Sequence, residues 1–220
     1  MNNQNNKTVY FVRHAQSLHN TEPVFQAFDI PLSKQGLHQA EIIATRIAAI
    51  RPEIIIASTA PRAKQTAQAI KHKTKRDIIF SDLFSERKHP SAIDGQPYTN
   101  QAAETLWRQW QKTLYTHRSD RRIGDSENYQ DILNRADRAL KFLENRPESS
   151  LVVVTHGSFL RTILARSMLG NNLSGKTLRL FQERIRIANA GITVLQYQDA
   201  FEEDFAWRIL TLNDQSHFAS

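Results

Sequence analysis

The sequence predicts an α/β fold, a three-layer α/β/α sandwich with a mostly parallel central sheet. Short apolar runs rich in β-branched residues recur along the chain and end in polar residues. Segments with apolar residues at helical spacing separate them, and strands that alternate with helices typically form parallel sheets covered on both faces. No fixed repeat or linker divides the chain, so we expect one domain spanning residues 1–220.

The composition limits the possible functions. Apolar residues make up 40% of the chain, enough for a core, and the formal net charge of +7 favours anionic partners. The chain has no cysteine, which excludes disulfides, thiolate catalysis and cysteine-based metal sites. Residues 1–7 are polar, lack the apolar core of a signal peptide and are expected to form a disordered tail. No apolar run approaches the roughly 20 residues of a membrane span, so we expect a cytoplasmic protein without a membrane partner.

The first predicted strand covers residues 9–12 and ends at Arg13 and His14. Arginine offers a fork of donors suited to phosphate, and a histidine nitrogen can attack, accept a proton or bind metal. Taken alone, a surface Arg-His pair at a strand end is an equally good interpretation. Ser33 is suited to cap the next helix, whose apolar periodicity ends before Pro52.

The next two predicted strands cover residues 54–57 and 78–80. The first of them ends in polar residues, and Pro61 fits the first turn of the following helix. Arg62 lies in that turn, where free backbone N–H groups and the helix dipole favour anions. Arg62 is therefore placed to complete an anion site.

Residues 82–127 are polar and interrupted by proline and glycine, which indicates an excursion from the sheet. We expect this segment to form a helical cap insertion over one end of the sheet, where loops usually carry function. One helix inside it would carry Trp107, Trp110 and Leu114 on a single face. Glu86 lies where the excursion begins.

The remaining elements repeat the opening pattern. A periodic helix spans residues 132–143, and a strand at 151–154 ends at Thr155, His156 and Gly157 before a helix that opens at Ser158. Residues 192–197 and 207–212 are two further predicted strands, and residues 199–204 are expected to form the turn of a hairpin between them.

Three apolar strands thus deliver Arg13 and His14, Arg62, and His156 to what should be one edge of the sheet. At these positions the chain resembles the histidine phosphatase superfamily, in its larger, phosphoglycerate-mutase-like branch. Five segments carry the resemblance in order. They read VRHAQSLHN, DIPLSKQGLHQA, ASTAPRAKQTA, GDSENYQDILNR and VVVTHGSFLR. They are similar to the Arg-His-Gly signature, the Pro-Leu-Thr segment, the Ser-Ser…Arg-Ala element, the Gly-Glu-Ser segment and the second His-Gly motif.

The resemblance implies a site and a mechanism. His14 would be the nucleophile that forms a phosphohistidine, and Glu86 matches the acidic residue that protonates the leaving group. Four side chains would hold the phosphoryl oxygens, namely Arg13, Asn20, Arg62 and His156. His14 must be neutral to attack, so its other ring nitrogen should donate to a backbone carbonyl or a similar acceptor. No cofactor or metal is expected, because the sequence shows no carboxylate cluster suited to magnesium.

Two departures from the family pattern matter. Ala15 replaces the glycine that follows the nucleophile; alanine fits if φ is negative, but its methyl group could narrow the pocket. After Glu86 the chain reads ERKHPSAIDG instead of continuing to a glycine and Glu-Gly, which leaves the orientation of Glu86 open. Arg87 and Lys88 could add charge for the substrate, although exposed, solvated side chains are the more usual case.

We therefore expect a metal-independent phosphomonoesterase that acts on a small phosphorylated metabolite and not on nucleic acid. Two alternatives remain. A phosphoglycerate-type mutase is disfavoured by the altered segment after Glu86. A catalytically silent module that binds a phosphorylated ligand is favoured only by Ala15. The natural substrate and the oligomeric state are left open by the sequence.

Overall fold

A six-stranded sheet forms the centre of the protein, seen in a computed structural model that describes residues 6–115, 121–198 and 206–219. The strand order is β3-β2-β4-β1-β5-β6. The strands are β1 (Lys7–Arg13), β2 (Ile54–Ala57), β3 (Ile78–Phe80), β4 (Ser150–Thr155), β5 (Ile192–Tyr197) and β6 (Trp207–Asp214). The first four in this order run parallel, whereas β5 is antiparallel to β1 and β6 is antiparallel to β5. The predicted α/β fold with a mostly parallel sheet is confirmed.

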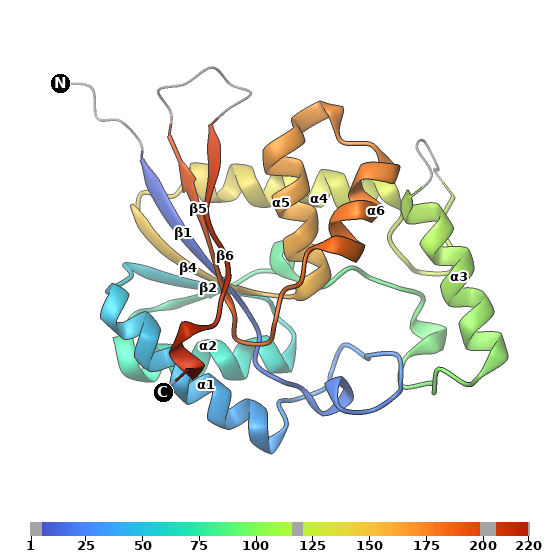
Figure 1. The fold of residues 1–220 in the computed structure, drawn as a ribbon, viewed down its shortest axis with the longest axis horizontal. Helices are drawn as coiled ribbons and strands as arrows, with labels where there is room; N and C mark the ends of the chain where they lie inside the picture. Colours follow the sequence, from blue (N-terminus) through green and yellow to red (C-terminus); the bar gives the residue numbers. More distant parts are fainter. Residues whose placement is uncertain (1–5, 116–120, 199–205, 220) are drawn as a thin grey trace.

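Helices cover both faces of the sheet (Figure 1). Alternation along β4 explains the layers, because Leu151 and Val153 pack under α4 (Tyr129–Glu144) and α5 (Gly157–Leu169). Val152 and Val154 pack on the opposite face under α1 (Lys34–Ile50) and α2 (Pro61–Thr74). Both faces of β4 are therefore buried, as is typical of parallel strands.

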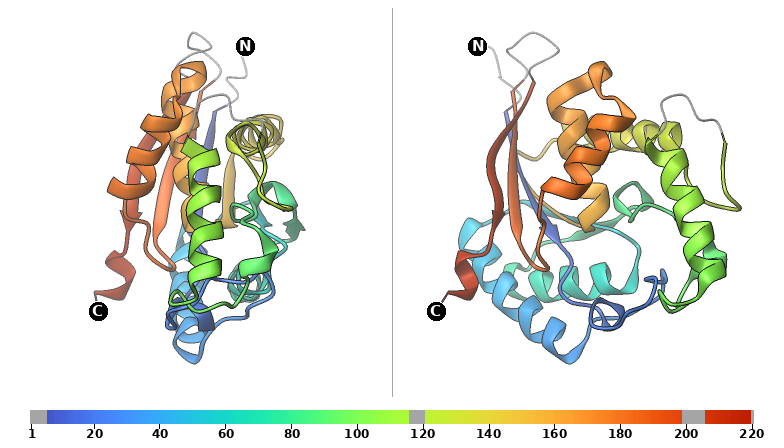
Figure 2. Two further views of the ribbon diagram at one scale, coloured as in Figure 1. Left: turned by 90° about the vertical axis from the view of Figure 1, so that its right-hand side faces the viewer. Right: turned by 45° about the vertical axis from the view of Figure 1, so that its right-hand side comes forward.

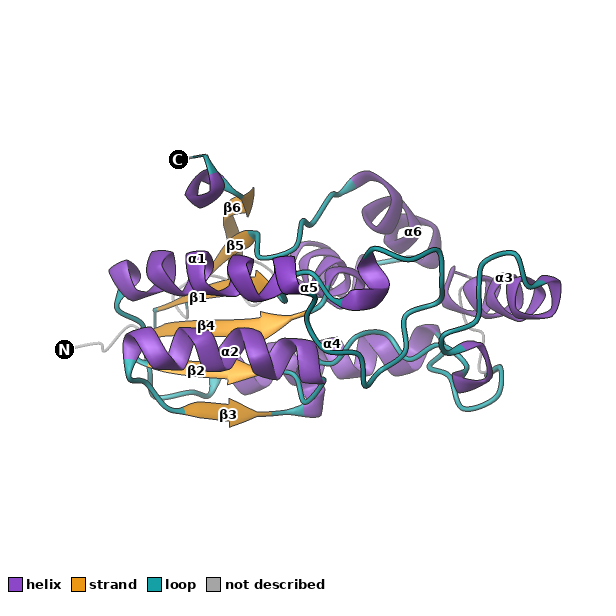
Figure 3. Cartoon of the chain, turned by 90° about the horizontal axis from the view of Figure 1, so that it is seen from below, coloured by secondary structure: helices purple, strands orange, loops and turns teal. Residues whose placement is uncertain are grey.

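The two remaining long helices lie outside these layers. α3 (Gln101–Tyr115) lies beyond the carboxyl ends of the parallel strands (Figures 2 and 3). α6 (Gly175–Arg184) packs against α5 and α3. Gly175 permits this approach, since a Cβ atom there would lie 2.2 Å from the carbonyl oxygen of Tyr115. The apolar periodicity of the sequence did not predict α6, so this helix is seen only in the structure.

The start of α1 packs directly on the segment that follows β1. Ser33 caps the helix as predicted, accepting a hydrogen bond from the Gly36 N–H at 3.0 Å. A Cβ atom at Gly36 would lie 1.9 Å from the carbonyl oxygen of Gln16. A glycine is required here, so α1 fixes the backbone two residues after His14.

The prediction that residues 1–7 form a disordered tail is wrong for Lys7. Lys7 begins β1, is buried and pairs with Tyr197. Its Nζ donates to the carbonyl oxygens of Arg146 and Glu148. These partners are distant in sequence, which is why local composition did not indicate them. Residues 1–5 and the predicted turn at 199–204 lie outside the described residues, although β5 and β6 form the expected antiparallel pair.

Candidate functional site

Two histidines meet where β1 and β4 end. The strands are neighbours, with Arg13 paired to Thr155, and the His14 N–H donates to the Thr155 carbonyl oxygen at 2.9 Å. The ring centroids of His14 and His156 lie 5.0 Å apart. Both side chains are fully buried or nearly so. The structure therefore brings together the two histidines that the sequence placed at one edge of the sheet.

Arg62 links the two rings from the first turn of α2. Its Nε donates to His14 Nε2, and its Nη2 donates to His156 Nδ1, both at 3.3 Å. The remaining branch donates to the carbonyl oxygens of Ala27 and Phe28. Burial, with a smaller contribution from Arg13, lowers the pKa of Arg62 to about 10, while the Glu86 carboxylate opposes this shift. The guanidinium remains charged at neutral pH.

Arg13 adds a second, partly buried cation. Its Nη1 donates to the Ile187 carbonyl oxygen at 2.7 Å, and its buried Nε has no hydrogen-bond partner among the described residues. Burial lowers its pKa to about 10, against the attraction of Glu86. Across the described ranges, the salt bridges include neither Arg13 nor Arg62. Arg62 is buried, Arg13 is partly buried and neither forms a salt bridge there, so the two form a site suited to an anion.

Hydrogen bonding fixes the proton position on His14. Its Nδ1 lies 2.7 Å from the Ala15 carbonyl oxygen, which can only accept, so Nδ1 carries the proton. Its Nε2 then presents a lone pair, which accepts from Arg62. Burial first, and then Arg62 and Arg13, lower the pKa of His14 well below its usual value. A neutral ring with an unprotonated Nε2 is the state that can attack phosphorus.

His156 has the opposite arrangement. Its Nδ1 accepts from Arg62, so in the neutral ring Nε2 carries the proton and donates to Ser58 Oγ at 2.8 Å. Burial and the neighbouring cations lower its pKa well below the usual value. Sequence reasoning had not assigned a role to Ser58, and its position at the polar end of β2 was the available signal.

Glu86 faces the start of α5. Its carboxylate accepts from the N–H groups of Ser158 and Phe159 at 3.1 and 2.8 Å, and from that of Arg87 at 2.9 Å. The charge of this carboxylate opposes the burial that lowers the pKa values of Arg13 and Arg62. The altered ERKHPS segment therefore does not turn Glu86 away from the site. The carboxylate is held in place by backbone donors.

Arg135 of α4 holds the segment that carries Glu86. Its guanidinium donates to the carbonyl oxygens of Leu83, Ser85 and Glu86. It also forms a bidentate pair with Glu127, with N···O distances of 2.7 and 2.8 Å. Sequence reasoning missed this function, because an arginine in a helical repeat is usually a solvated surface residue.

Arg87 and Lys88 differ in their surroundings. Lys88 is exposed and pairs with Asp125 at 3.1 Å. The expectation that Arg87 is also exposed is wrong: its side chain is buried, lies over the Trp110 ring and donates to the Tyr115 hydroxyl. Two aromatic residues of α3 therefore contact its guanidinium group, an environment that local sequence does not indicate.

The two remaining sequence questions concern Asn20 and Ala15. Asn20 ends a short 3₁₀ helix after β1, and its Oδ1 accepts from the Ser17 N–H at 3.0 Å. Ala15 is absent from the described residues with positive φ, so alanine is compatible with its backbone. Its methyl group is buried in the core cluster beneath α1 and α2. Ala15 therefore provides no argument against catalysis.

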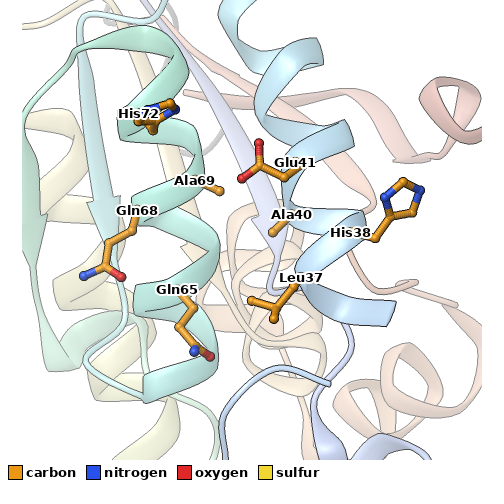
Figure 4. A pocket seen from close by; sticks show the side chains of 8 residues that line it. All are labelled: Leu37, His38, Ala40, Glu41, Gln65, Gln68, Ala69 and His72. Atoms are coloured by element: carbon orange, nitrogen blue, oxygen red, sulfur yellow. The ribbon is translucent and has the colours of Figure 1, made fainter. Parts of the chain in front are cut away.

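A separate surface pocket of about 550 Å³ lies between α1 and α2 (Figure 4). It contains none of the side chains described above. His38 and His72 belong to its lining but do not point toward one another (Figure 4). Within the described part of the chain, no group of three or more His, Asp or Glu side chains could hold a metal ion. No helix of the described residues is both long and apolar enough to cross a bilayer.

Known proteins resemble this chain over nearly its whole length. The sequence model of the histidine phosphatase superfamily (branch 1) matches residues 9–215. The chain is 29% identical over 212 residues to the "Probable phosphoglycerate mutase GpmB" of Escherichia coli O1:K1 / APEC, covering 95% of this chain and 94% of that protein.

Solved structures share the fold. A mycobacterial glucosyl-3-phosphoglycerate phosphatase superposes with a TM-score of 0.74 at 20% identity, covering 94% of this chain and 99% of that one. The alpha-ribazole phosphatase of Shigella flexneri does so with a TM-score of 0.74 at 15% identity, covering 94% and 96%. Because the family model spans nearly the whole sequence, the chain belongs to branch 1 of the histidine phosphatase superfamily.

Proposed function

We propose that the protein is a metal-independent phosphomonoesterase that acts on a small phosphorylated metabolite through a phosphohistidine at His14. The observation that carries this proposal is the proton position on His14. Its Nδ1 proton is bound by the Ala15 carbonyl oxygen, so the Nε2 lone pair faces the cationic cluster. A nucleophile beside two guanidinium groups suits a substrate that arrives as a phosphate dianion.

In the first step, His14 Nε2 attacks phosphorus and the bond to the ester oxygen breaks. Arg13, Arg62 and Asn20 donate to the three equatorial oxygens, over which the negative charge spreads. His156 joins them when its Nε2–H exchanges Ser58 Oγ for a phosphoryl oxygen. The leaving oxygen takes a proton from Glu86. The carboxylate position, fixed by the N–H groups of Ser158 and Phe159, supports this role.

In the second step, water attacks the phosphorus atom of the phosphohistidine. Glu86 now accepts a proton from that water, and the P–N bond breaks to release inorganic phosphate. The electron pair returns to His14 Nε2, which restores the starting state. One carboxyl group thus serves as acid and then as base.

The burial of the cations favours a small substrate over nucleic acid. Single-stranded nucleic acid binds along exposed positive grooves with stacking aromatic residues. Arg62 is instead buried, and Arg13 is partly buried, at the ends of the strands. A terminal phosphate group can reach such a site, whereas the phosphodiester backbone of a duplex cannot enter it. The cap insertion is the segment we expect to choose the rest of the substrate.

Release of phosphate from para-nitrophenyl phosphate tests the activity directly. Rapid quench with labelled substrate should also trap an acid-labile, base-stable phosphoenzyme. Binding of inorganic phosphate without any turnover of this or other phosphomonoesters would instead support the silent binding module.

A phosphoglycerate-type mutase is the second candidate, favoured by the similarity to a protein named as a probable phosphoglycerate mutase. A mutase would keep the same phosphohistidine but transfer the group back to a second hydroxyl. It would need a bisphosphate primer and would isomerise phosphoglycerate without net release of phosphate. Assaying both reactions on one preparation separates the two candidates.

A further inference from the structure

Asn189 joins the two segments that carry the candidate phosphate ligands. It lies between α6 and β5, and its Nδ2 donates to the His14 carbonyl oxygen at 3.0 Å and to Asn20 Oδ1 at 3.1 Å. The backbone around it is fixed to the end of β1, since the Ala190 N–H donates to the Arg13 carbonyl oxygen at 2.9 Å. Ala190 has a φ of 54°, an uncommon conformation for alanine, which orients this short turn.

The surrounding bonds determine how both amides are oriented. The Ser17 N–H can only donate, so Asn20 must present its Oδ1 to it. Asn189 therefore has to present its NH₂ group to the same oxygen. Its other contact, the carbonyl oxygen of His14, can only accept and requires the same orientation. Two independent neighbours thus support one assignment of the amide atoms.

This arrangement leaves one group unused. Asn20 Oδ1 is occupied by two donors, from Ser17 and Asn189. The NH₂ group of Asn20 has no hydrogen-bond partner within the ranges that the structure describes. Two donors on the oxygen hold the amide plane, so its nitrogen is directed away from both Ser17 and Asn189.

We propose that Asn189 is a positioning residue that holds the Asn20 amide with its NH₂ group available to a phosphoryl oxygen. The inference rests on the proposed function, in which Asn20 binds the phosphoryl group. Without Asn189, Ser17 alone would hold the Asn20 oxygen, and rotation of the amide would no longer be restricted from two sides.

The test is the affinity for orthovanadate, measured by titration calorimetry, which requires no turnover. Asn189→Ala and Asn20→Ala are each expected to weaken binding about tenfold, the usual effect of losing one hydrogen bond to a charged group. The double variant should bind no more weakly than Asn20→Ala, because Asn189 acts through Asn20. The exposed Asn172→Ala, in the loop after α5, is the matched control and should bind like the wild type.

Two results would contradict the proposed role of Asn189, and a third, distinct result would reject the proposed function on which that role rests. Wild-type affinity in Asn189→Ala, or losses that multiply in the double variant, would show that Asn189 does not act through Asn20. If Asn189→Ala fails to fold, Asn189→Ser enters the same cycle, since it retains one donor in a smaller side chain. Absence of both vanadate binding and ester hydrolysis in the wild type would reject the proposed function itself, and this inference with it.

Discussion

The ends of β1 and β4 present nearly the same local pattern with different chemistry. Each strand has an apolar centre and is followed directly by a buried histidine. In His14 the proton lies on Nδ1, toward Ala15, and Nε2 is free to attack. In His156 the proton lies on Nε2, toward Ser58, and Nδ1 accepts from Arg62. The hydrogen-bond partners of each ring, and not the pattern of a strand followed by a histidine, therefore decide which nitrogen can react.

The largest expected effect separates the two histidines. His14→Ala should lower kcat by at least about 10⁴-fold, since the group that forms the covalent intermediate is lost. His156→Ala should cost about 10²–10³-fold, the usual result of removing one group that stabilises transition-state charge. Turnover of para-nitrophenyl phosphate and phosphoenzyme yield measure both. Exposed His38→Ala is the control. Near wild-type turnover in His14→Ala would contradict the proposed mechanism.

Glu86→Gln should discriminate between leaving groups. An alkyl phosphate leaves as a strongly basic alkoxide and needs the proton, so its rate should fall by about 10²–10⁴-fold. Para-nitrophenolate leaves readily without a proton, so its phosphate should be affected much less. Equal losses on the two substrates would mean that Glu86 mainly holds the start of α5. If neither rate fell, Asp94 would be the next carboxylate to test.

Ser58→Ala tests the proton position on His156 separately from that on His14, because Ser58 hydrogen-bonds to His156. Loss of this acceptor should reduce kcat/KM about tenfold, in keeping with one hydrogen bond at a buried site. The phosphoenzyme should still form at His14. Thr59→Ala, next along the chain, is the matched control, because the Thr59 hydroxyl donates to the exposed Asp82. An unchanged rate in Ser58→Ala would show that the His156 proton position is unimportant.

The pH dependence of the free energy of unfolding should depend on the protonation of His14 and His156. In the unfolded chain each ring takes up a proton as the pH falls below about 6.5, whereas the buried rings stay neutral because burial and the arginines lower their pKa values. The contribution of each ring to the free energy of unfolding is therefore fully present above about pH 6.5. It decreases below that pH, by up to about 1.4 kcal/mol per pH unit for each histidine.

Urea unfolding between pH 7 and pH 5 measures this slope. Replacing His14 or His156 by glutamine should each reduce it, while His38→Gln should leave the contribution of the two buried rings unchanged. A slope unaffected by either buried substitution would mean that these rings take up protons in the folded state over the same range.

The smallest expected effect is that of metal removal. Arg13 and Arg62 provide the positive charge that a metal ion would otherwise supply, so EDTA should leave turnover unchanged. Vanadate should still inhibit once the EDTA and the metal bound to it have been dialysed away, since EDTA itself binds vanadate. Activity lost in EDTA and restored by magnesium would contradict the proposed mechanism.

Local sequence predicted an element best where the residues of that element alone carry its pattern. Residues 192–197 were predicted as a strand and form β5, because their β-branched and apolar pattern is continuous. The helix α6 was missed because only Gly175 and Leu178 are buried in it, so it has no broad apolar face. Its packing on α5 and α3 depends on tertiary contacts that periodicity does not reveal.

The sequence alone determined that His14, Arg62 and His156 follow strands of one sheet. The polar residues that follow β1, β2 and β4 must lie at one edge, because parallel strands share the direction of their carboxyl ends. Only the tertiary structure decided the proton positions on His14 and His156, the burial of Arg87 and the backbone donors around Glu86. These depend on hydrogen-bond directions between segments as much as 98 residues apart, such as Ser58 and His156. The fold has to bring such atoms together before their chemistry is defined.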